Sequence, residues 1–429
     1  MKHLTVQESY LTWEDGTPFF YLGDTAWELA HRLNREEVAL YFQTRARQGF
    51  NAAQIVVLAE RDGLTQPNAY GRLPLLQPGE LPDPELPDVG GEYSYWDHLD
   101  YIVDTAAQYD MFVTLLPTWG DKFNKRWGIG PEIFTPKNAY VYAKWLAQRY
   151  ADRWNIIWML GGDRPLEEEN HRRIIDAMAS GIWAVDPVHL ITFHPSGNHQ
   201  STEYVADAPY IDIHSAQTGH NVAHCYESDR IMLKMREFGK PYFDSEPRYE
   251  DHPACFDASI GYYWDAADVR ENAYRNMLAG ACGHTYGNHN IWIMNREPTS
   301  YFPYVWSEAL THPGAEQIGY VKKLRLSRDF RSLEPADELV LTPYEGSGRV
   351  TAARGAGYVY AYSPLGLPFT LESDFEDAKG ARASWFDPRT GEEKVFTIVP
   401  AKGKMTYAPP SSGKGCDWVL ILDAVKAAK

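Results

Sequence analysis

The feature that most constrains the fold is a repeated alternation of short apolar runs and helix-like stretches between residues 19 and 286. Continuous apolar runs are typical of parallel strands that are buried on both faces. The expected strands are Phe19–Leu22, Ala52–Leu58, Met111–Trp119, Ile156–Asp163, Leu190–His194, Tyr210–Ser215, Pro241–Ser245 and Cys282–Tyr286. The expected helices are Asn34–Gln48, Tyr95–Tyr109, Lys137–Ala151, Glu167–Ala184, Val222–Phe238 and Ala266–Ala279.

Eight strand-then-helix repeats predict an α/β fold of the (β/α)8 TIM-barrel type. A doubly wound open sheet would alternate in the same way. However, the sequence contains no GxGxxG or P-loop to mark a nucleotide-binding switch point. The barrel is therefore the favoured fold. The Pro/Gly-rich segment 61–91 is longer than an ordinary βα connection, and loops of this length tend to be functional or disordered.

Beyond about Pro335 the sequence changes to short β-type runs between Gly, Pro and Asp turns. The expected strands there are Leu339–Thr342, Val350–Ala353, Tyr358–Ser363, Ser384–Asp387, Val395–Val399 and Trp418–Leu422. This pattern predicts a small antiparallel β-sandwich. The chain is thus expected to divide into a catalytic barrel, residues 1–334, and a C-terminal accessory domain, residues 335–429, that packs on the barrel or binds sugar.

The composition excludes several kinds of partner. A formal net charge of −17 argues against nucleic acids and anionic membrane surfaces, which require basic patches. No segment approaches the ~20 apolar residues of a membrane span, and the first residues lack the apolar core of a signal peptide. The four cysteines, Cys225, Cys255, Cys282 and Cys416, show no CxxC spacing. We therefore expect a cytoplasmic protein with reduced thiols, while the sequence carries no indication of its oligomeric state.

Two carboxylates follow buried strands at positions that could bring them together. Asp163 comes after the fourth expected strand and two glycines, and Glu246 comes after the seventh. In a closed barrel these strands direct their ends into one mouth from opposite sides. A separation of about 5 Å suits a retaining glycosidase, whereas an inverting pair needs more room for a water molecule. The dry MLGG setting favours a protonated Asp163, while Arg248 and the strand-end histidines could keep Glu246 ionised.

Further side chains at strand ends are expected to line the same mouth and bind substrate. They are Asp24, Trp27, Trp119, His194, His214, Gln217, His284, Tyr286 and Trp292. His194, His214, His284 and His289, which fall at or just after strand ends, could instead form a metal-dependent hydrolase site together with Asp24 and Asp163. The sequence has neither an HxH pair on the first strand nor an HExxH helix motif. We therefore interpret the histidines as hydrogen-bond donors to sugar hydroxyls, and predict no metal and no cofactor.

Five motifs together resemble those of one enzyme family. GDTAW follows the first strand, WMLGGD closes the fourth, SEP closes the seventh, and WFDPRTGE and PPSSGKGCDWVLIL lie near the end. From roughly Tyr10 to Leu422 the chain is similar to glycoside hydrolase family 140 and its apiosidase-like relatives. The resemblance implies a (β/α)8 barrel joined to a β-sandwich that is labelled as collagen-binding. It also implies Asp163 as acid/base and Glu246 as nucleophile.

The resemblance implies retaining hydrolysis of β-linked apiose, with a small glycoside or an oligosaccharide as substrate. Relatives that act on pectin are usually exported, so the missing export signal favours apiosylated plant glycosides or short pectin-derived oligosaccharides. Two alternatives remain open. One is an α-L-arabinofuranosidase or another furanosidase on the same scaffold, and the other is a non-catalytic carbohydrate- or matrix-binding protein.

Overall fold

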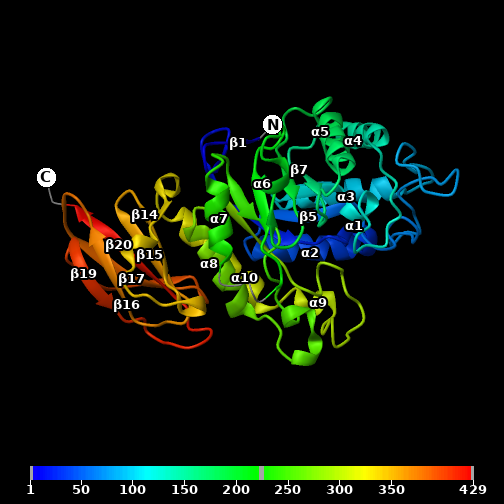
Figure 1. The fold of residues 1–429 in the computed structure, drawn as a ribbon. Helices are drawn as coiled ribbons and strands as arrows, with labels where there is room; N and C mark the ends of the chain where they lie inside the picture. Colours follow the sequence, from blue (N-terminus) through cyan, green and yellow to red (C-terminus); the bar gives the residue numbers. More distant parts are fainter. Residues whose placement is uncertain (1–2, 222–226, 427–429) are drawn as a thin grey trace.

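The computed structural model describes residues 3–221 and 227–426, which form a barrel followed by a β-rich C-terminal part (Figure 1). The barrel strands are β4 (Tyr21–Thr25), β5 (Ala52–Leu58), β6 (Phe112–Thr118), β7 (Ile156–Gly161), β8 (Ile191–His194), β10 (His214–Gln217), β11 (Tyr242–Asp244) and β12 (Gly283–Tyr286). Neighbouring strands pair in parallel in the order β8-β7-β6-β5-β4-β12-β11-β10. A parallel bridge between Thr192 and Ile213 joins the two edges. The predicted TIM barrel is therefore confirmed.

Helices cover the outside of this barrel. They are α1 (Leu29–Arg32), α2 (Arg35–Arg47), α3 (Tyr95–Gln108), α4 (Pro136–Tyr150), α5 (Glu169–Trp183), α6 (Thr202–Val205), α7 (Ser228–Arg236), α8 (Ala266–Leu278), α9 (Trp306–Ala309) and α10 (Pro313–Leu326). Local signals start several of them: Asn34 with Glu37, and Ser94 with Asp97, form capping boxes at α2 and α3. Within the predicted helix Val222–Phe238, residues 222–226 lie outside the described part of the chain.

Side chains alternate between two buried layers along each barrel strand. Tyr21, Val56 and Met159 belong to a cluster that fills the barrel, together with residues of the N-terminal strands. Leu22 and Trp158, one position away from members of that cluster, pack instead against the helices. Because successive strand residues point to opposite faces, the register decides which strand-end groups can reach a site at the barrel mouth.

The N-terminal segment forms a small antiparallel sheet of β1 (Leu4–Val6), β2 (Leu11–Trp13) and β3 (Pro18–Phe19). The turn predicted at Glu14–Thr17 joins β2 to β3. Leu11 and Phe19 pack with Phe112 in the cluster inside the barrel. Because Phe112 begins β6, this small sheet covers the amino end of the barrel and leaves the carboxyl end open.

The C-terminal part is a sandwich of two antiparallel sheets. Its strands are β13 (Glu334–Pro335), β14 (Thr351–Gly355), β15 (Tyr358–Ser363), β16 (Phe369–Asp374), β17 (Ala378–Asp387), β18 (Glu392–Val399), β19 (Lys402–Tyr407) and β20 (Trp418–Lys426). The larger sheet has the order β13-β14-β15-β20-β17-β18, and β16 pairs with β19. The predicted strand Leu339–Thr342 is wrong, because Asp337–Leu339 is a 3-10 turn and Val340 makes only an isolated bridge to Leu371.

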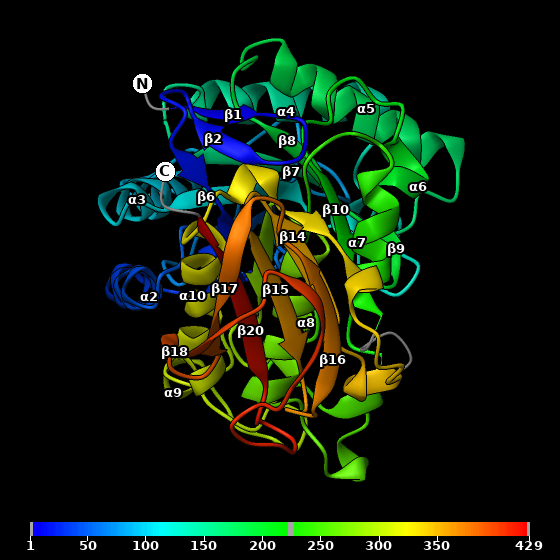
Figure 2. The same ribbon diagram turned by 90° about the vertical axis from the view of Figure 1, so that its left-hand side faces the viewer.

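The larger sheet lies against α8 and α10 of the barrel, as the view in Figure 2 shows. Arg270 of α8 makes a two-pronged ion pair with Asp417, and both side chains are buried. Tyr274 of the same helix stacks on Tyr362 of β15, with ring centroids 5.1 Å apart. The two parts are therefore joined by a packed and charge-paired contact.

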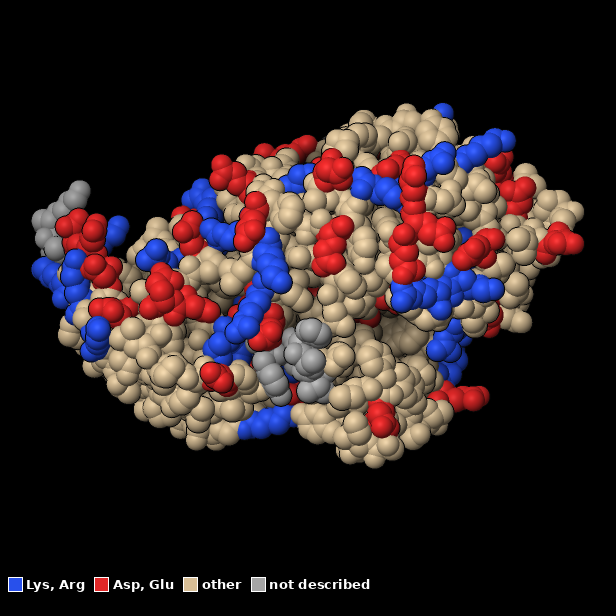
Figure 3. Space-filling model, in the orientation of Figure 1, with Lys and Arg blue, Asp and Glu red and all other residues tan. Residues whose placement is uncertain are grey.

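Acidic and basic side chains are interspersed over the face of the molecule seen in Figure 3, and no single-sign patch dominates it. Among the described residues, no helix combines the length and the hydrophobicity that a membrane crossing requires.

Candidate active site

A cavity of about 430 Å³ opens at the carboxyl ends of the barrel strands. Both predicted carboxylates, Asp163 and Glu246, line it. Its other lining residues are Trp27, Glu60, Trp119, Trp127, Gly197, Asn198, Gln217, Gly219, His220, Asn221, Tyr249, His252, Phe256, His289, Trp292 and Tyr301. The cavity therefore combines three carboxyl groups with many aromatic and histidine rings.

Glu246 follows β11 and is held by two histidines. His220 Nε2 donates to Glu246 Oε1 over 3.0 Å, and His194 Nε2 lies 3.1 Å from Oε2. Burial by itself raises the pKa of Glu246, but the hydrogen bonds and charges of His194 and His220 outweigh it and lower the pKa to about 2. Glu246 is thus ionised over the whole range in which most enzymes work.

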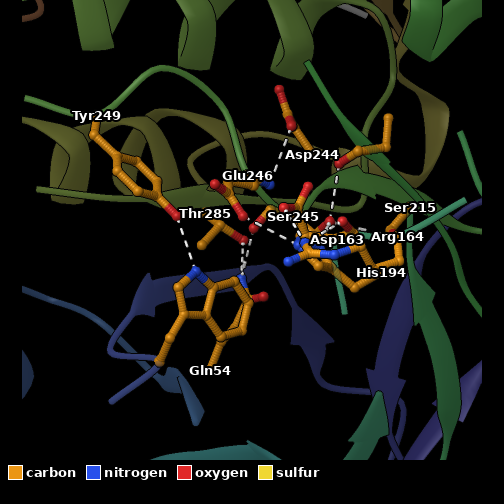
Figure 4. Close-up of polar contacts among 12 residues, drawn as sticks. Gln54, Asp163, Arg164, His194, Ser215, Asp244, Ser245, Glu246, Tyr249 and Thr285 are labelled. Carbon is orange, nitrogen blue, oxygen red and sulfur yellow. Dashed lines mark hydrogen bonds and ion pairs between the residues drawn. The ribbon is translucent and has the colours of Figure 1, made fainter. Parts of the chain in front are cut away.

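The residues around Glu246 are themselves fixed. His194 Nδ1 is 3.0 Å from Ser245 Oγ, and its ring packs against those of Trp27 and Trp119, with centroids 5.0 and 5.7 Å away. Below Glu246, Gln54 Nε2 donates to the Ser245 carbonyl oxygen over 3.0 Å (Figure 4). These contacts hold the carboxylate and its histidine partner in one orientation.

Asp163 owes its position to an unusual backbone. Its φ is +56°, and it follows Gly161 and Gly162, whose φ values are +92° and +112°. A Cβ atom on Gly162 would lie 2.6 Å from the backbone nitrogen of Gly120. Only glycine fits this close approach, so the two glycines that end β7 allow the chain to turn Asp163 into the cavity.

Asp163 has the opposite electrostatic environment to Glu246. Its Oδ2 accepts hydrogen bonds from Trp127 Nε1 at 3.2 Å and Arg164 Nη1 at 2.9 Å. Burial and the negative charge of Glu246 nevertheless raise the pKa of Asp163, against the opposing effects of Arg164 and His194. The two carboxyl groups are therefore driven apart in pKa, as an acid and a nucleophile require.

The structure brings most of the predicted aromatic and amide groups to the cavity. Trp27, Trp119, Gln217 and Trp292 line it. Trp27 packs on Trp119 at 5.2 Å and donates from Nε1 to Tyr249 Oη. Of the predicted site histidines, His194 reaches the cavity through its contact with Glu246.

The prediction that Asp24 and Tyr286 lie at the mouth is wrong. They are paired across β4 and β12, in the row of side chains that faces the helices. Asp24 Oδ2 accepts from Tyr41 Oη at 2.6 Å and from Arg45 Nε at 2.7 Å. Tyr286 Oη donates to Glu250 Oε2. These side chains support the barrel from outside.

The predicted placement of His214, His284 and Arg248 is also wrong. His214 begins its strand, β10, and its Nδ1 contacts Ser201 Oγ at 3.0 Å. His284 lies in the same outward row as Leu22, fully buried, and burial lowers its pKa to about 3. Arg248 stacks over Trp264 at 5.1 Å rather than contacting Glu246, so the histidines His194 and His220 keep Glu246 ionised in its place.

Several cavity residues were not predicted from the sequence, and most lie in loops without periodicity. They include Glu60, Trp127, His220, Tyr249, His252, Phe256 and Tyr301. Glu60 had a usable signal, because it follows β5 by two residues, as Asp163 follows β7.

The cavity histidines pack ring against ring. The rings of His220 and His252 are 4.4 Å apart, and those of His252 and His289 are 4.3 Å apart. Burial lowers the pKa of His289 to about 3 and that of His252 well below its usual value. Among residues 3–221 and 227–426, no group of three or more His, Cys, Asp or Glu side chains has an arrangement that could hold a metal ion.

A TIM barrel with one carboxyl group after its fourth strand and another after its seventh, both lining one cavity, is the arrangement expected of a barrel glycoside hydrolase. Residues 6–332 match the family model "Apiosidase-like, catalytic domain". Residues 335–423 match "Putative collagen-binding domain of a collagenase". The chain belongs to the apiosidase-like family and is a glycoside hydrolase.

Solved structures agree with this assignment. A glycoside hydrolase family 5 protein from Bacteroides vulgatus is 29% identical, with a TM-score of 0.89 over 98% of this chain and 94% of that one. A second structure, described as a glycoside hydrolase, is 30% identical, with a TM-score of 0.88 over 100% and 97% of the two chains. An endo-1,4-beta-D-mannanase from Thermotoga petrophila, 14% identical with a TM-score of 0.51 over 71% of this chain and all of that one, shares the fold alone. No curated protein matches the chain.

Proposed function

We propose that the protein is a retaining glycoside hydrolase that removes a terminal furanosyl residue, and that β-apiosidase is its activity. The observation that carries the proposal is the electrostatic difference between the two carboxyl groups of one cavity. Glu246 has its pKa lowered to about 2 by His194 and His220, whereas the pKa of Asp163 is raised by burial and by Glu246 itself. The family description supports apiose as the sugar.

In the proposed mechanism, Glu246 attacks the anomeric carbon while Asp163 donates its proton to the leaving glycosidic oxygen. The bond from the anomeric carbon to that oxygen breaks, and a glycosyl ester of Glu246 forms. Asp163, now ionised, then takes a proton from a water molecule that attacks the same carbon and frees Glu246. Arg164 and Trp127 donate hydrogen bonds to Asp163 Oδ2, so they stabilise the ionised state between the two steps.

The cavity has features that suit a small sugar. Its volume of about 430 Å³ and its aromatic walls fit one ring with part of the leaving group. Rings such as Trp27 and Trp292 can pack against the C–H face of a sugar, while Gln217 and His289 offer polar groups to its hydroxyls. These groups are also compatible with another furanose, so an α-L-arabinofuranosidase is the second candidate.

Three experiments test the proposal. A panel of aryl furanosides and apiosylated glycosides, with the released sugar identified, separates β-apiosidase from arabinofuranosidase activity. Glu246→Ala should lower hydrolysis by several orders of magnitude while the protein still folds. A variant that folds and retains activity would refute the assignment of the nucleophile and favour a binding protein. Loss of activity on EDTA treatment, with recovery on adding metal, would instead favour the metallohydrolase alternative.

A further inference from the structure

Two carboxylates share one arginine at the edge of the cavity. Arg164 is fully buried, and its Nη1 donates to Asp163 Oδ2 at 2.9 Å. Its Nη2 donates to Glu60 Oε1 at 3.2 Å. The ring of Trp127 covers the guanidinium at 4.9 Å and donates to the same Oδ2 of Asp163. Arg164 therefore bridges the proposed acid and a third carboxylate, in the arrangement shown in part by Figure 4.

The nearby acidic groups have cations of their own. Asp121 lies 2.9 Å from Lys122 Nζ, and Glu28 accepts from Arg32 Nε at 2.8 Å. Glu246 is held by His194 and His220. In the described part of the chain, the ion pair of Glu60 is with Arg164. The charge of Arg164 is thus divided between Glu60 and Asp163.

We propose that Glu60 is a positioning residue that, by competing for Arg164, keeps Asp163 in the protonated form needed to protonate the leaving oxygen. This inference rests on the proposed function, because it assigns a role to Glu60 in the first proton transfer. Glu60 itself exchanges no proton with substrate. Its carboxylate offsets the positive charge that would otherwise stabilise ionised Asp163 before substrate is cleaved.

The ionisation of Glu60 supports the competition. Burial raises the pKa of Glu60 to about 7; Arg164 opposes this shift, while Asp163, Asp121 and Glu28 add to it. The pKa of Asp163 is raised as well. The negative charge of each acid therefore raises the pKa of the other, so the two carboxyl groups compete for the one cation, Arg164.

Glu60→Gln tests the inference, since the amide keeps a hydrogen-bond acceptor for Arg164 but removes the charge. Arg164 would then act on Asp163 alone and lower its pKa. The basic limb of the kcat/KM profile should move to lower pH by about one unit. At pH values above that limb, kcat/KM for phenyl β-D-apiofuranoside should fall about tenfold, because its leaving group needs protonation. The 4-nitrophenolate leaving group needs less protonation, so kcat/KM for the 4-nitrophenyl glycoside should fall much less.

Two further variants serve as controls. Glu60→Asp keeps the charge and should keep a basic limb close to that of the wild type, although its side chain is shorter. Glu167→Gln removes the exposed ion-pair partner of Arg126 and should leave the profile unchanged. A basic limb at the wild-type pH in Glu60→Gln, with equal losses for both leaving groups, would refute the inference.

The same measurements separate this inference from the proposed function. If Asp163→Ala and Glu246→Ala both remain active, the proposed function fails whatever Glu60→Gln does. If Asp163→Ala and Glu246→Ala lose activity while Glu60→Gln keeps the basic limb at the wild-type pH, only the role of Glu60 is refuted. A shifted limb in Glu60→Gln together with inactive Asp163→Ala and Glu246→Ala supports both.

Discussion

His220→Ala should weaken the ionised state of Glu246 and so expose the electrostatic basis of the site. In the folded protein the pKa of Glu246 falls from 4.5 to about 2, because the hydrogen bonds and charges of His194 and His220 exceed the opposing effect of burial. At about 1.4 kcal/mol per pKa unit, this difference corresponds to roughly 3 kcal/mol in favour of the ionised form. Because the pKa is lower in the folded state, this stabilisation is present above pH 4.5 and is lost as the pH falls towards 2.

Removing one histidine removes one hydrogen bond to a charged group, worth about 1.5–3 kcal/mol. The pKa of Glu246 should therefore rise by about one to two units. The wild-type kcat/KM should stay level down to about pH 3, whereas His220→Ala should show an acid limb near pH 4. Urea unfolding at pH 7 should report a loss of stability of about the same 1.5–3 kcal/mol.

His199→Ala is the matched control for this experiment. His199 also pairs with a glutamate, Glu203, at 2.6 Å, but both side chains are exposed. This variant should keep the wild-type profile and stability, since exposed pairs contribute little. If kcat/KM of His220→Ala were lower than that of the wild type by the same factor at every pH, with no new acid limb, His220 would not be the group that keeps Glu246 ionised.

Two further predictions concern the acid. Trp127→Phe keeps an aromatic ring beside Arg164 but removes the indole N–H that donates to Asp163 over 3.2 Å. In steady-state kinetics, kcat/KM should therefore fall by about 3–10-fold. A variant with the wild-type kcat/KM would show that the indole N–H has no role. Gly162→Ala places a Cβ 2.6 Å from a backbone nitrogen at φ +112° and should lower the free energy of unfolding by about 1–3 kcal/mol in urea. Gly79→Ala, with nothing within 4 Å, is the control, and equal losses in the two variants would contradict the steric argument.

The barrel could be predicted because its strands are nearly continuous apolar runs, a local property of the chain. The same runs predicted where Asp163 and Glu246 lie, because counting the strands is enough to assign these residues to the ends of the fourth and seventh strands. The direction of each side chain could not be predicted in this way. Asp24 and Tyr286 are correctly placed near strand ends, but in an outward-facing row of the sheet. A difference of one residue in register reverses the face.

Other differences come from element bounds and from loops. The sixth barrel strand was expected to end at Ser215, but it runs from His214 to Gln217, so His214 lies at its start instead of its end. His220 and Tyr249 reach the cavity from connections that have no periodicity, and only the folded chain brings them to Glu246. The presence of Asp163 and Glu246 in one cavity was therefore predictable from the sequence, as was His194, whereas His220 and Trp127, the loop residues that contact the two carboxyl groups, were not.

In the proposed mechanism, Glu246 forms a covalent glycosyl ester that Asp163 helps to hydrolyse. Intact-protein and peptide mass spectrometry of Asp163→Ala, incubated with 4-nitrophenyl β-D-apiofuranoside, tests it most directly. This substrate leaves without much protonation, but the second step lacks its base, so the ester should accumulate. The protein should gain the mass of one furanosyl unit, on the peptide that contains Glu246. Release of sugar with inverted configuration and no adduct, or an adduct on another residue, would contradict it.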